Sequence, residues 1–300
     1  MDLVLGSTGL VGSAIKRKLS NSLSPNSKEL NLMNCKDVED YFIKNKPTNV
    51  YLAAAKVGGI MANSTYPADF IYKNLIIQTN VINACKNINA KLLFLGSSCI
   101  YPKYCNQPIK EEYLLSGHLE QTNESYAIAK IAGLQMCKAY NQQYNTNFIC
   151  AMPTNIYGIN DNFDLQNSHV LPAMIRKFYE ASKTNSDVIL WGDGSARREF
   201  LNSDDLADAC IFLMNNYNSS EIINVGSGKD ISIKNLAELI ADITKFKNRI
   251  IFDTSKPNGT PVKKLDTSKI NNLGWYPKIS LREGIIKTYN WYSNESRRVL

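Results

Sequence analysis

The sequence lacks the features that would direct it to a membrane, to an oxidising compartment or to nucleic acid. No apolar run in its 300 residues is long enough to span a bilayer, and MDLVLGSTG at the start has no charged segment followed by an apolar one. The seven cysteines form no CxxC pair and no metal-ligand spacing. Positive residues are scattered rather than blocked. These absences predict a reduced, cytoplasmic protein with no bound metal, no membrane and no nucleic-acid partner.

Histidine is also scarce, since the chain holds only two, His118 and His169. The rest of the composition is ordinary for a globular enzyme, with 44% hydrophobic and 20% charged residues. The formal net charge of +7 favours anionic small ligands such as phosphates.

Apolar runs alternate with helical patterns through the first half of the chain. This spacing of strand, helix and strand predicts right-handed βαβ units, and therefore an α/β fold with a Rossmann-type, doubly wound parallel sheet. The expected strands cover residues 2–6, 49–55, 91–96 and 147–153, and the expected helices lie near 10–20, 67–87 and 125–143.

After about residue 160 the rhythm changes, and the run IINVGSG at 222–228 resembles one more strand of the first sheet. The sequence thus predicts a first domain over 1–160 with return segments about 199–228, and a smaller interleaved C-terminal domain mostly over 161–300. Here we expect helices near 169–183, 204–216, 232–245 and 281–292, and strands near 187–192, 198–201 and 249–252.

A glycine-rich segment, GSTGLVG at residues 6–12, ends the first strand and opens the first helix. Its glycines suit a tight turn, close approach of a pyrophosphate and packing of the helix on the strand, although a plain strand-to-helix turn has the same composition. The helix N-terminus would attract the phosphates. The residues predicted to hold a dinucleotide here are Gly6, Ser7, Thr8, Gly9, Leu10, Val11 and Gly12.

The choice of dinucleotide depends on the region after the expected second strand, which reads SPNSKELNL at 24–32. NAD-binding proteins usually place an acid there, whereas this chain has Ser27 and Lys28. A lysine can neutralise a 2′-phosphate, so we predict NADP. Lys28 as a simple solvated lysine is the alternative.

The segment YAIAK places Tyr126 and Lys130 four residues apart, on one face of a helix. A nearby ammonium stabilises a phenolate and lowers the pKa of the phenol, which suits Tyr126 for proton transfer to a carbonyl during reduction. YEASK repeats the spacing with Tyr179 and Lys183. The first match is favoured because it follows the strand that ends in GSSC, inside the parallel-sheet half.

Together these segments resemble the extended short-chain dehydrogenase/reductases and, within them, the GDP-L-fucose synthase family. The likeness covers nearly the whole chain, and several of its blocks are specific to the family. The blocks are LAAAKVGGI (52–60), GSSCIYPK (96–103), TNESYAIAKIAG (122–133), MPTNIYG (152–158), DNF (161–163), SHVLPA (168–173), WGDGSARREFL (191–201) and INVGSG (223–228).

The resemblance implies a NADPH-dependent enzyme acting on a GDP-linked 4-keto sugar. Ser97 would hydrogen-bond the ketone beside Tyr126, and Lys130 would bind the nicotinamide ribose. Asn155 would line both the cofactor and the sugar pocket. Further contacts with the cofactor are implied for Ala53, Leu95, Gly96, Ser98, Pro153, Ile156 and His169.

Cys99 and His169 match the acid–base pair with which the family inverts carbons C3 and C5. A ketone at C4 acidifies the C–H bonds on both neighbouring carbons, and inversion needs one proton-transfer group on each face. Cys99 as a buried structural cysteine and His169 as a capping or packing residue are the alternatives. His118 is expected at the surface.

The second domain would recognise the GDP-sugar. Lys177, Arg198 and Lys263 resemble positions that contact the diphosphate, and Trp191 would pack against the nucleotide or sugar. A solvated positive face is the alternative for the three cations. Val170, Asn155 and Asn258 complete the predicted substrate-binding set.

Four positions depart from the family pattern. Thr8 replaces a frequent basic residue, Ser27 a common Arg, Asn202 a frequent His and Asn258 an Asp. The last two leave the sugar open. The main hypothesis is conversion of GDP-4-keto-6-deoxy-D-mannose to GDP-L-fucose by C3/C5 epimerisation and C4 reduction. The alternative is C4 reduction alone, on a related sugar such as a GDP-6-deoxy-heptose. The resemblance also implies a homodimer formed by the helices near 67–87 and 125–143.

Overall fold

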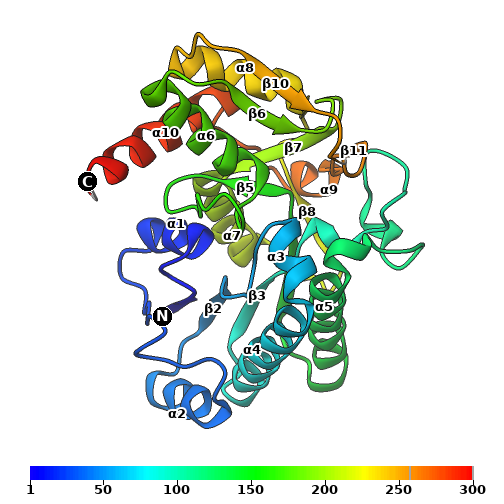
Figure 1. The fold of residues 1–300 in the computed structure, drawn as a ribbon. Helices are drawn as coiled ribbons and strands as arrows, with labels where there is room; N and C mark the ends of the chain where they lie inside the picture. The colour runs from blue at the N-terminus through cyan, green and yellow to red at the C-terminus, as the bar shows by residue number, and fades with distance from the viewer. Residues whose placement is uncertain (257, 299–300) are drawn as a thin grey trace.

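The computed structural model describes residues 1–256 and 258–298. Its larger part contains a five-stranded sheet in the order β1-β2-β3-β4-β8, and all neighbouring strands are parallel (Figure 1). This confirms the predicted α/β fold, including the strand expected at 222–228. The strands are β1 (Asp2–Leu5), β2 (Asn49–Leu52), β3 (Lys91–Leu95), β4 (Phe148–Pro153) and β8 (Ile223–Val225).

Helices cover both faces of this sheet, which explains why its strands are continuous apolar runs. Side chains alternate along a strand, so Leu3 and Leu5 pack into one core while Val4 packs into the other. The first core lies under α2, α4 and α5, and the second under α1 and α7. These helices are α1 (Leu10–Lys18), α2 (Cys35–Asn45), α4 (Pro67–Asn87), α5 (Glu124–Tyr144) and α7 (Ser203–Asn216).

The smaller part is built around β7 (Figure 1). The first residues of β7 pair with β11 and with β9, and its later residues pair with β5. A separate two-stranded sheet, β6 with β10, lies beside it. The elements are β5 (Asn155–Tyr157), α6 (Val170–Thr184), β6 (Val188–Trp191), β7 (Arg197–Asn202), β9 (Asp230–Ser232), α8 (Ile233–Thr244), β10 (Ile250–Asp253), β11 (Val262–Lys263) and α10 (Leu281–Arg298).

The predicted return segment 199–228 is divided between the two parts. Strand β8 joins the first sheet and α7 covers it, whereas β7 belongs to the second sheet. Helix α2 was not predicted from the sequence, because only Val38 and Phe42 of its residues are buried. Other short elements are α3 (Ile60–Thr65), α9 (Ser268–Asn272) and the 3₁₀ turns η1 (Ser98–Ile100), η2 (Glu111–Tyr113) and η3 (Gln121–Asn123).

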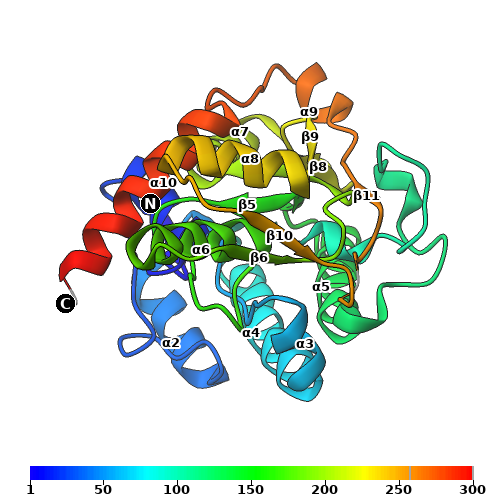
Figure 2. The same ribbon diagram turned by 45° about the horizontal axis from the view of Figure 1, so that its top comes forward.

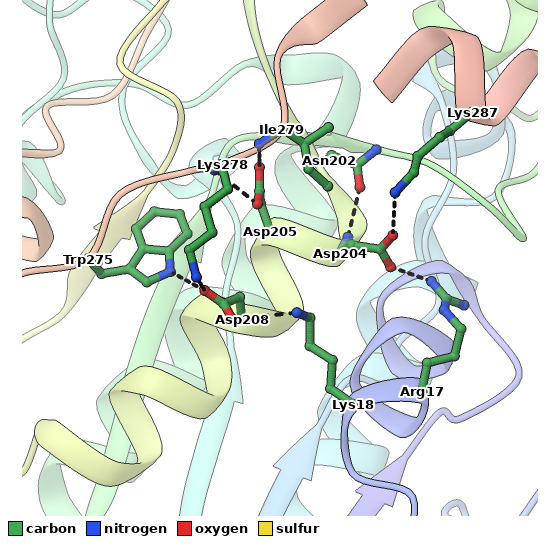
Figure 3. A network of polar contacts seen from close by, with 10 residues as sticks. All are labelled: Arg17, Lys18, Asn202, Asp204, Asp205, Asp208, Trp275, Lys278, Ile279 and Lys287. Carbon is green, nitrogen blue, oxygen red and sulfur yellow. Dashed lines mark hydrogen bonds and ion pairs between the residues drawn. The ribbon is translucent and has the colours of Figure 1, made fainter. Parts of the chain in front are cut away.

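The first turns of α7 connect the two parts through acidic side chains (Figure 3). Asn202 caps the helix, with its Oδ1 accepting from the backbone N–H of Asp204 at 2.9 Å. Asp204 pairs with Arg17 of α1 at 2.6 Å and with Lys287 of α10 at 4.0 Å. The Asn202 side chain therefore has a structural use as a helix cap, at a position where the family often has His.

Asp205 and Asp208 fasten the segment that leads to α10 (Figure 3). The buried Asp205 carboxylate accepts from the backbone N–H groups of Lys278 at 3.1 Å and Ile279 at 2.9 Å. Asp208 accepts from the Trp275 indole at 3.2 Å and pairs with two lysines, Lys18 and Lys278.

Replacing Asp205 is expected to destabilise the fold more than replacing an exposed acid. Asp205→Ala leaves two backbone donors unpaired, so its free energy of unfolding should fall by about 2 kcal/mol or more. Asp242→Ala removes only an exposed pair with Arg282 and should change it by less than about 0.5 kcal/mol. Urea unfolding of both variants measures the difference, and equal effects would contradict this account.

Candidate active site

The glycine-rich loop between β1 and α1 has the shape that a dinucleotide requires. Gly6 adopts a φ of +85°, and a Cβ there would lie 2.6 Å from the backbone N of Ala54. A Cβ on Gly12 would lie 2.1 Å from the Gly6 carbonyl oxygen. A Cβ on Gly9, at the N-cap of α1, would meet only that oxygen, at 3.6 Å. The two crowded glycines permit the turn and the packing, while Gly9 leaves space for a phosphate.

The turn that contains Lys28 is tied to this loop. The Ser7 hydroxyl donates to the carbonyl oxygen of Ser24 at 3.0 Å, and Asn26 Oδ1 accepts from the backbone N–H of Lys28 at 2.9 Å. The Lys28 and Thr8 side chains are exposed. Lys28 therefore lies on a turn held against the cofactor loop, which suits the predicted contact with a 2′-phosphate.

Ser97, Tyr126 and Lys130 meet at the carboxyl end of β3. Ser97 follows the strand, and its hydroxyl hydrogen-bonds the Tyr126 phenol and accepts from the backbone N–H of Cys99 at 3.2 Å. The buried Lys130 donates to the Leu95 carbonyl oxygen at 2.8 Å, and its Nζ lies 5.9 Å from the Tyr126 ring centroid. One helix and one strand end thus bring three predicted catalytic groups together.

Burial controls the titration of Tyr126 and Lys130. It raises the pKa of Tyr126 above its ordinary value, the nearby Cys99 raises it further, and the Ser97 hydroxyl opposes the rise. Burial also lowers the pKa of Lys130 to about 8. The expected lowering of the Tyr126 pKa by Lys130 is therefore not observed, because the ammonium is directed to the Leu95 carbonyl and desolvation dominates.

The Cys99 thiol lies at the centre of a second group. Its Sγ accepts from Asn123 Nδ2 at 3.3 Å and from Lys263 Nζ at 3.5 Å. His169 precedes α6 but makes no side-chain capping bond, although capping was the alternative to a catalytic role. Desolvation by the surrounding protein atoms lowers the pKa of His169, and the Lys263 charge lowers it further. Part of the His169 side chain nevertheless remains exposed. Lys263 thus contacts one member of the predicted pair, Cys99, and lowers the pKa of the other, His169.

The predicted substrate contacts fall into two places. Arg198 and Lys263 are register partners on β7 and β11, and the Arg198 guanidinium donates to the Thr260 carbonyl oxygen at 2.5 Å. Lys177 donates to the Ile189 carbonyl oxygen on β6 at 2.8 Å, close in sequence to Trp191. Burial lowers the pKa of both Lys177 and Arg198, which argues against a purely solvated positive face.

Trp191 and Asn258 lie on the smaller part of the molecule. The Trp191 side chain is 51% exposed at the end of β6, and the Lys256 ammonium lies 5.9 Å from its ring centroid. Asn258 Oδ1 accepts from the backbone N–H of Asp193 at 2.8 Å, so it shapes the turn after β6. Val170 begins α6 and is 37% exposed.

The remaining predicted cofactor contacts lie at the carboxyl ends of the parallel strands, where ligands bind in such folds. Asn155 Nδ2 donates to the Glu199 carbonyl oxygen at 2.8 Å, which fixes its side chain. The others at these strand ends are Ala53 after β2, Leu95, Gly96 and Ser98 around the end of β3, Pro153 at the end of β4 and Ile156 in β5.

Sequence reasoning missed two residues of this site. Asn123, in TNESY, donates to Cys99, and its short distance from Tyr126 in the sequence was the available signal. Glu199 is fully buried, and its carboxylate accepts from the backbone N–H groups of Gly228 at 2.7 Å and Leu265 at 2.8 Å. An acid inside the strand REFL was a signal, but only the tertiary structure identifies its partners.

Removing the Lys130 charge is expected to stabilise the fold. The folded pKa of about 8 lies below that of an unfolded lysine, so the unfolded state binds more protons between these values. The Lys130 contribution to stability is therefore unfavourable at pH 7 and improves as pH rises through this window. Lys130→Met should raise the free energy of unfolding at pH 7 by about 2 kcal/mol, with a smaller gain at pH 9.5.

The exposed Lys183 of YEASK provides the matched control, since Lys183→Met should change stability by less than about 0.5 kcal/mol at either pH. Urea unfolding at the two pH values measures both variants. A Lys130→Met protein that is less stable at pH 7, or whose gain grows with pH, would refute the assignment of an unfavourable buried charge.

Known proteins resemble this chain over nearly its whole length. Residues 3–226 match the model of the NAD dependent epimerase/dehydratase family. The putative GDP-L-fucose synthase 2 of Arabidopsis thaliana is 57% identical over 296 residues, covering 96% of this chain and 90% of that protein. The GDP-L-fucose synthase of Escherichia coli is 49% identical over 311 residues, with coverage of 98% and 97%.

A solved structure gives the same result for the fold. The GDP-mannoheptose C4 reductase of Campylobacter jejuni with NADP bound superposes with a TM-score of 0.89 at 39% identity, covering 97% of this chain and 98% of that one. The sequence matches, the parallel sheet and the glycine-rich loop all indicate the same family. The chain belongs to the NAD dependent epimerase/dehydratase family and, within it, to the GDP-L-fucose synthase family.

Proposed function

We propose that this enzyme converts GDP-4-keto-6-deoxy-D-mannose to GDP-L-fucose, by epimerisation at C3 and C5 followed by NADPH-dependent reduction at C4. The observation that carries the proposal is the meeting of Cys99 with Ser97 and Tyr126 at one strand end. A hydroxyl and a phenol suit reduction of a ketone, and a thiol beside them suits proton transfer at the neighbouring carbons.

NADP(H) is the cofactor, and the bound nucleotide supplies the hydride. The loop from Gly6 to Gly12 would hold the pyrophosphate, and Lys28 on its tied turn would meet the 2′-phosphate. The Campylobacter jejuni reductase with NADP bound supports this choice. We propose the cofactor domain over 1–160 with return segments within about 199–228, where α7 and β8 join the first sheet, and the substrate domain mostly over 161–300.

In the reduction, Tyr126 would donate its phenolic proton to the C4 oxygen, and Ser97 would hydrogen-bond the same oxygen. Burial raises the Tyr126 pKa and keeps the phenol protonated, ready to act as the acid. Lys130 would hold the nicotinamide ribose, exchanging the Leu95 carbonyl for its hydroxyls. The ammonium close to the Tyr126 ring would then stabilise the phenolate as it forms.

In the epimerisation, Cys99 and His169 would transfer protons at C3 and C5, whose C–H bonds the C4 ketone acidifies. Asn123 would hold the thiol in place. We propose that Arg198 and Lys177 bind the diphosphate together with Lys263, that Trp191 packs on the nucleotide, and that Val170, Asn155 and Asn258 line the sugar site.

Reduction at C4 alone is the second candidate function. The likeness to the GDP-mannoheptose C4 reductase favours it, since that enzyme is named for reduction at C4. The 57% and 49% identities to proteins named GDP-L-fucose synthase favour the bifunctional reaction. The presence of Cys99 with two donors on its sulfur agrees with the bifunctional reaction as well.

We further propose a cytoplasmic homodimer. All seven cysteines are free, which suits a reducing compartment. No helix in residues 1–256 and 258–298 is long and apolar enough to cross a membrane. Helices α4 and α5 lie side by side and expose Tyr72 by 60% and Ile128 by 44%, apolar groups that a second copy would cover (Figures 1 and 2).

The two half-reactions are expected to separate by mutation. In D₂O without NADPH, wild-type enzyme should introduce solvent deuterium at C3 and C5 of GDP-4-keto-6-deoxy-D-mannose, and Cys99→Ala should reduce this exchange at least about 100-fold. Tyr126→Phe should keep the exchange but reduce NADPH oxidation by a similar factor. Proton NMR and NADPH absorbance measure the two reactions.

Tyr179→Phe is the matched control, because the second Tyr-x-x-x-Lys lies on α6 and its buried hydroxyl has no hydrogen-bond partner within the described residues. It should preserve both reactions. Reduction without any exchange by wild-type enzyme would assign the C4-reductase function instead.

A charge on the α5 surface is expected to prevent dimerisation. Ile128→Asp should sediment as a monomer and wild type as a dimer, because an aspartate would be desolvated in the interface. Ile43→Asp, at a 61% exposed position on α2, should remain dimeric. A dimeric Ile128→Asp protein would exclude this surface as the interface.

A further inference from the structure

The backbone on both sides of Lys263 is fixed by hydrogen bonds. It ends β11, whose backbone pairs with β7. On either side, the Pro261 carbonyl oxygen accepts from Arg197 N–H at 2.7 Å, and Leu265 N–H donates to the Glu199 carboxylate at 2.8 Å. The strand therefore fixes where the Lys263 side chain begins.

The two neighbouring lysines on this strand have different partners. Lys264 Nζ lies 3.8 Å from the Asp230 carboxylate, whereas Lys263 Nζ donates to Cys99 Sγ at 3.5 Å. Adjacent side chains on a strand point to opposite faces, which accounts for the difference. Among the residues that the structure describes, no ion pair engages Lys263. Its half-buried charge is therefore paired with a thiol rather than with a carboxylate.

An ammonium beside a thiol favours the thiolate, the form that accepts a proton. His169 feels the same charge, since Lys263 contributes to the lowering of its pKa. Asn123 also donates to the sulfur, at 3.3 Å, and two donors on one Sγ suit an anion. Both side-chain contacts of the Cys99 sulfur are thus hydrogen-bond donors.

We infer that Lys263 is a positioning residue of the epimerisation, holding Cys99 as the thiolate that withdraws the proton, beyond any contact it makes with the diphosphate. This inference rests on the proposed function. In the step, the C–H bond next to the ketone breaks and its proton passes to Sγ. The electron pair forms the enolate, and His169 passes a proton from solvent to the opposite face of the carbon.

Alkylation of the full-length enzyme by iodoacetamide tests this without substrate, because only the thiolate reacts. Peptide mass spectrometry gives the rate at Cys99, with the exposed Cys35 as internal standard. Lys263→Met should slow alkylation of Cys99 about tenfold, and Lys263→Arg should restore most of the rate. Lys264→Met, on the same strand, should leave it unchanged. An unchanged Cys99 rate in a folded Lys263→Met protein would overturn the inference.

Deuterium exchange then separates positioning from anchoring. Lys263→Met should lower kcat for exchange at C3 and C5 about tenfold, while kcat for reduction of the already epimerised ketone stays unchanged; loss of the diphosphate contact would raise KM for both reactions alike. A lysine that only anchors the diphosphate would raise KM for both reactions and leave both kcat values unchanged, which would contradict the inference. If wild-type enzyme shows no exchange but Lys263 still controls alkylation, the proposed epimerisation fails while the contact between Lys263 and Cys99 stands.

Discussion

The buried carboxylate of Glu199 is the contact on which the geometry of the site depends. It is fully buried in β7 and accepts from the backbone N–H groups of Gly228, after β8, and Leu265, after β11. Its own carbonyl oxygen accepts from Asn155. One residue thus joins the edge of the parallel sheet to the strand that carries Lys263. Because a buried carboxylate without donors is unfavourable, these three segments must stay together.

The site also shows how burial and charge oppose one another. Lys130 keeps an ammonium in a desolvated position, with its pKa lowered to about 8, and Tyr126 keeps a phenol whose pKa is raised. The desolvated ammonium is unfavourable for the isolated fold, whereas the phenol is neutral near pH 7 in the folded and the unfolded state and has no such cost. Both groups would suit the proposed site, in which a ribose and a ketone oxygen replace the present partners.

One part of the prediction, the effect of Lys130 on the Tyr126 pKa, differs from the structure. The spacing of Tyr126 and Lys130 suggested a direct effect of the ammonium on the phenol, but Lys130 is directed to the Leu95 carbonyl. The equal spacing in YEASK places Lys183 Nζ only 4.3 Å from the Tyr179 ring centroid, yet that pair lies on α6, away from the strand ends. Sequence spacing fixes which side chains share a helix face, and it does not fix their surroundings.

The sequence by itself determined the α/β class, the glycine loop and the strand ends that carry Ser97 and Asn155, because these follow from local periodicity and glycine sterics. Only the tertiary structure decided that Lys263 contacts Cys99 and that Glu199 is buried between two distant backbone segments. It also decided that β7 belongs to the second sheet rather than to the first. Such contacts join residues far apart in the sequence, by 164 positions for Cys99 and Lys263 and by 66 for Glu199 and Leu265, and no local pattern encodes them. They form when distant elements pack against one another and exclude water, which requires the whole folded chain.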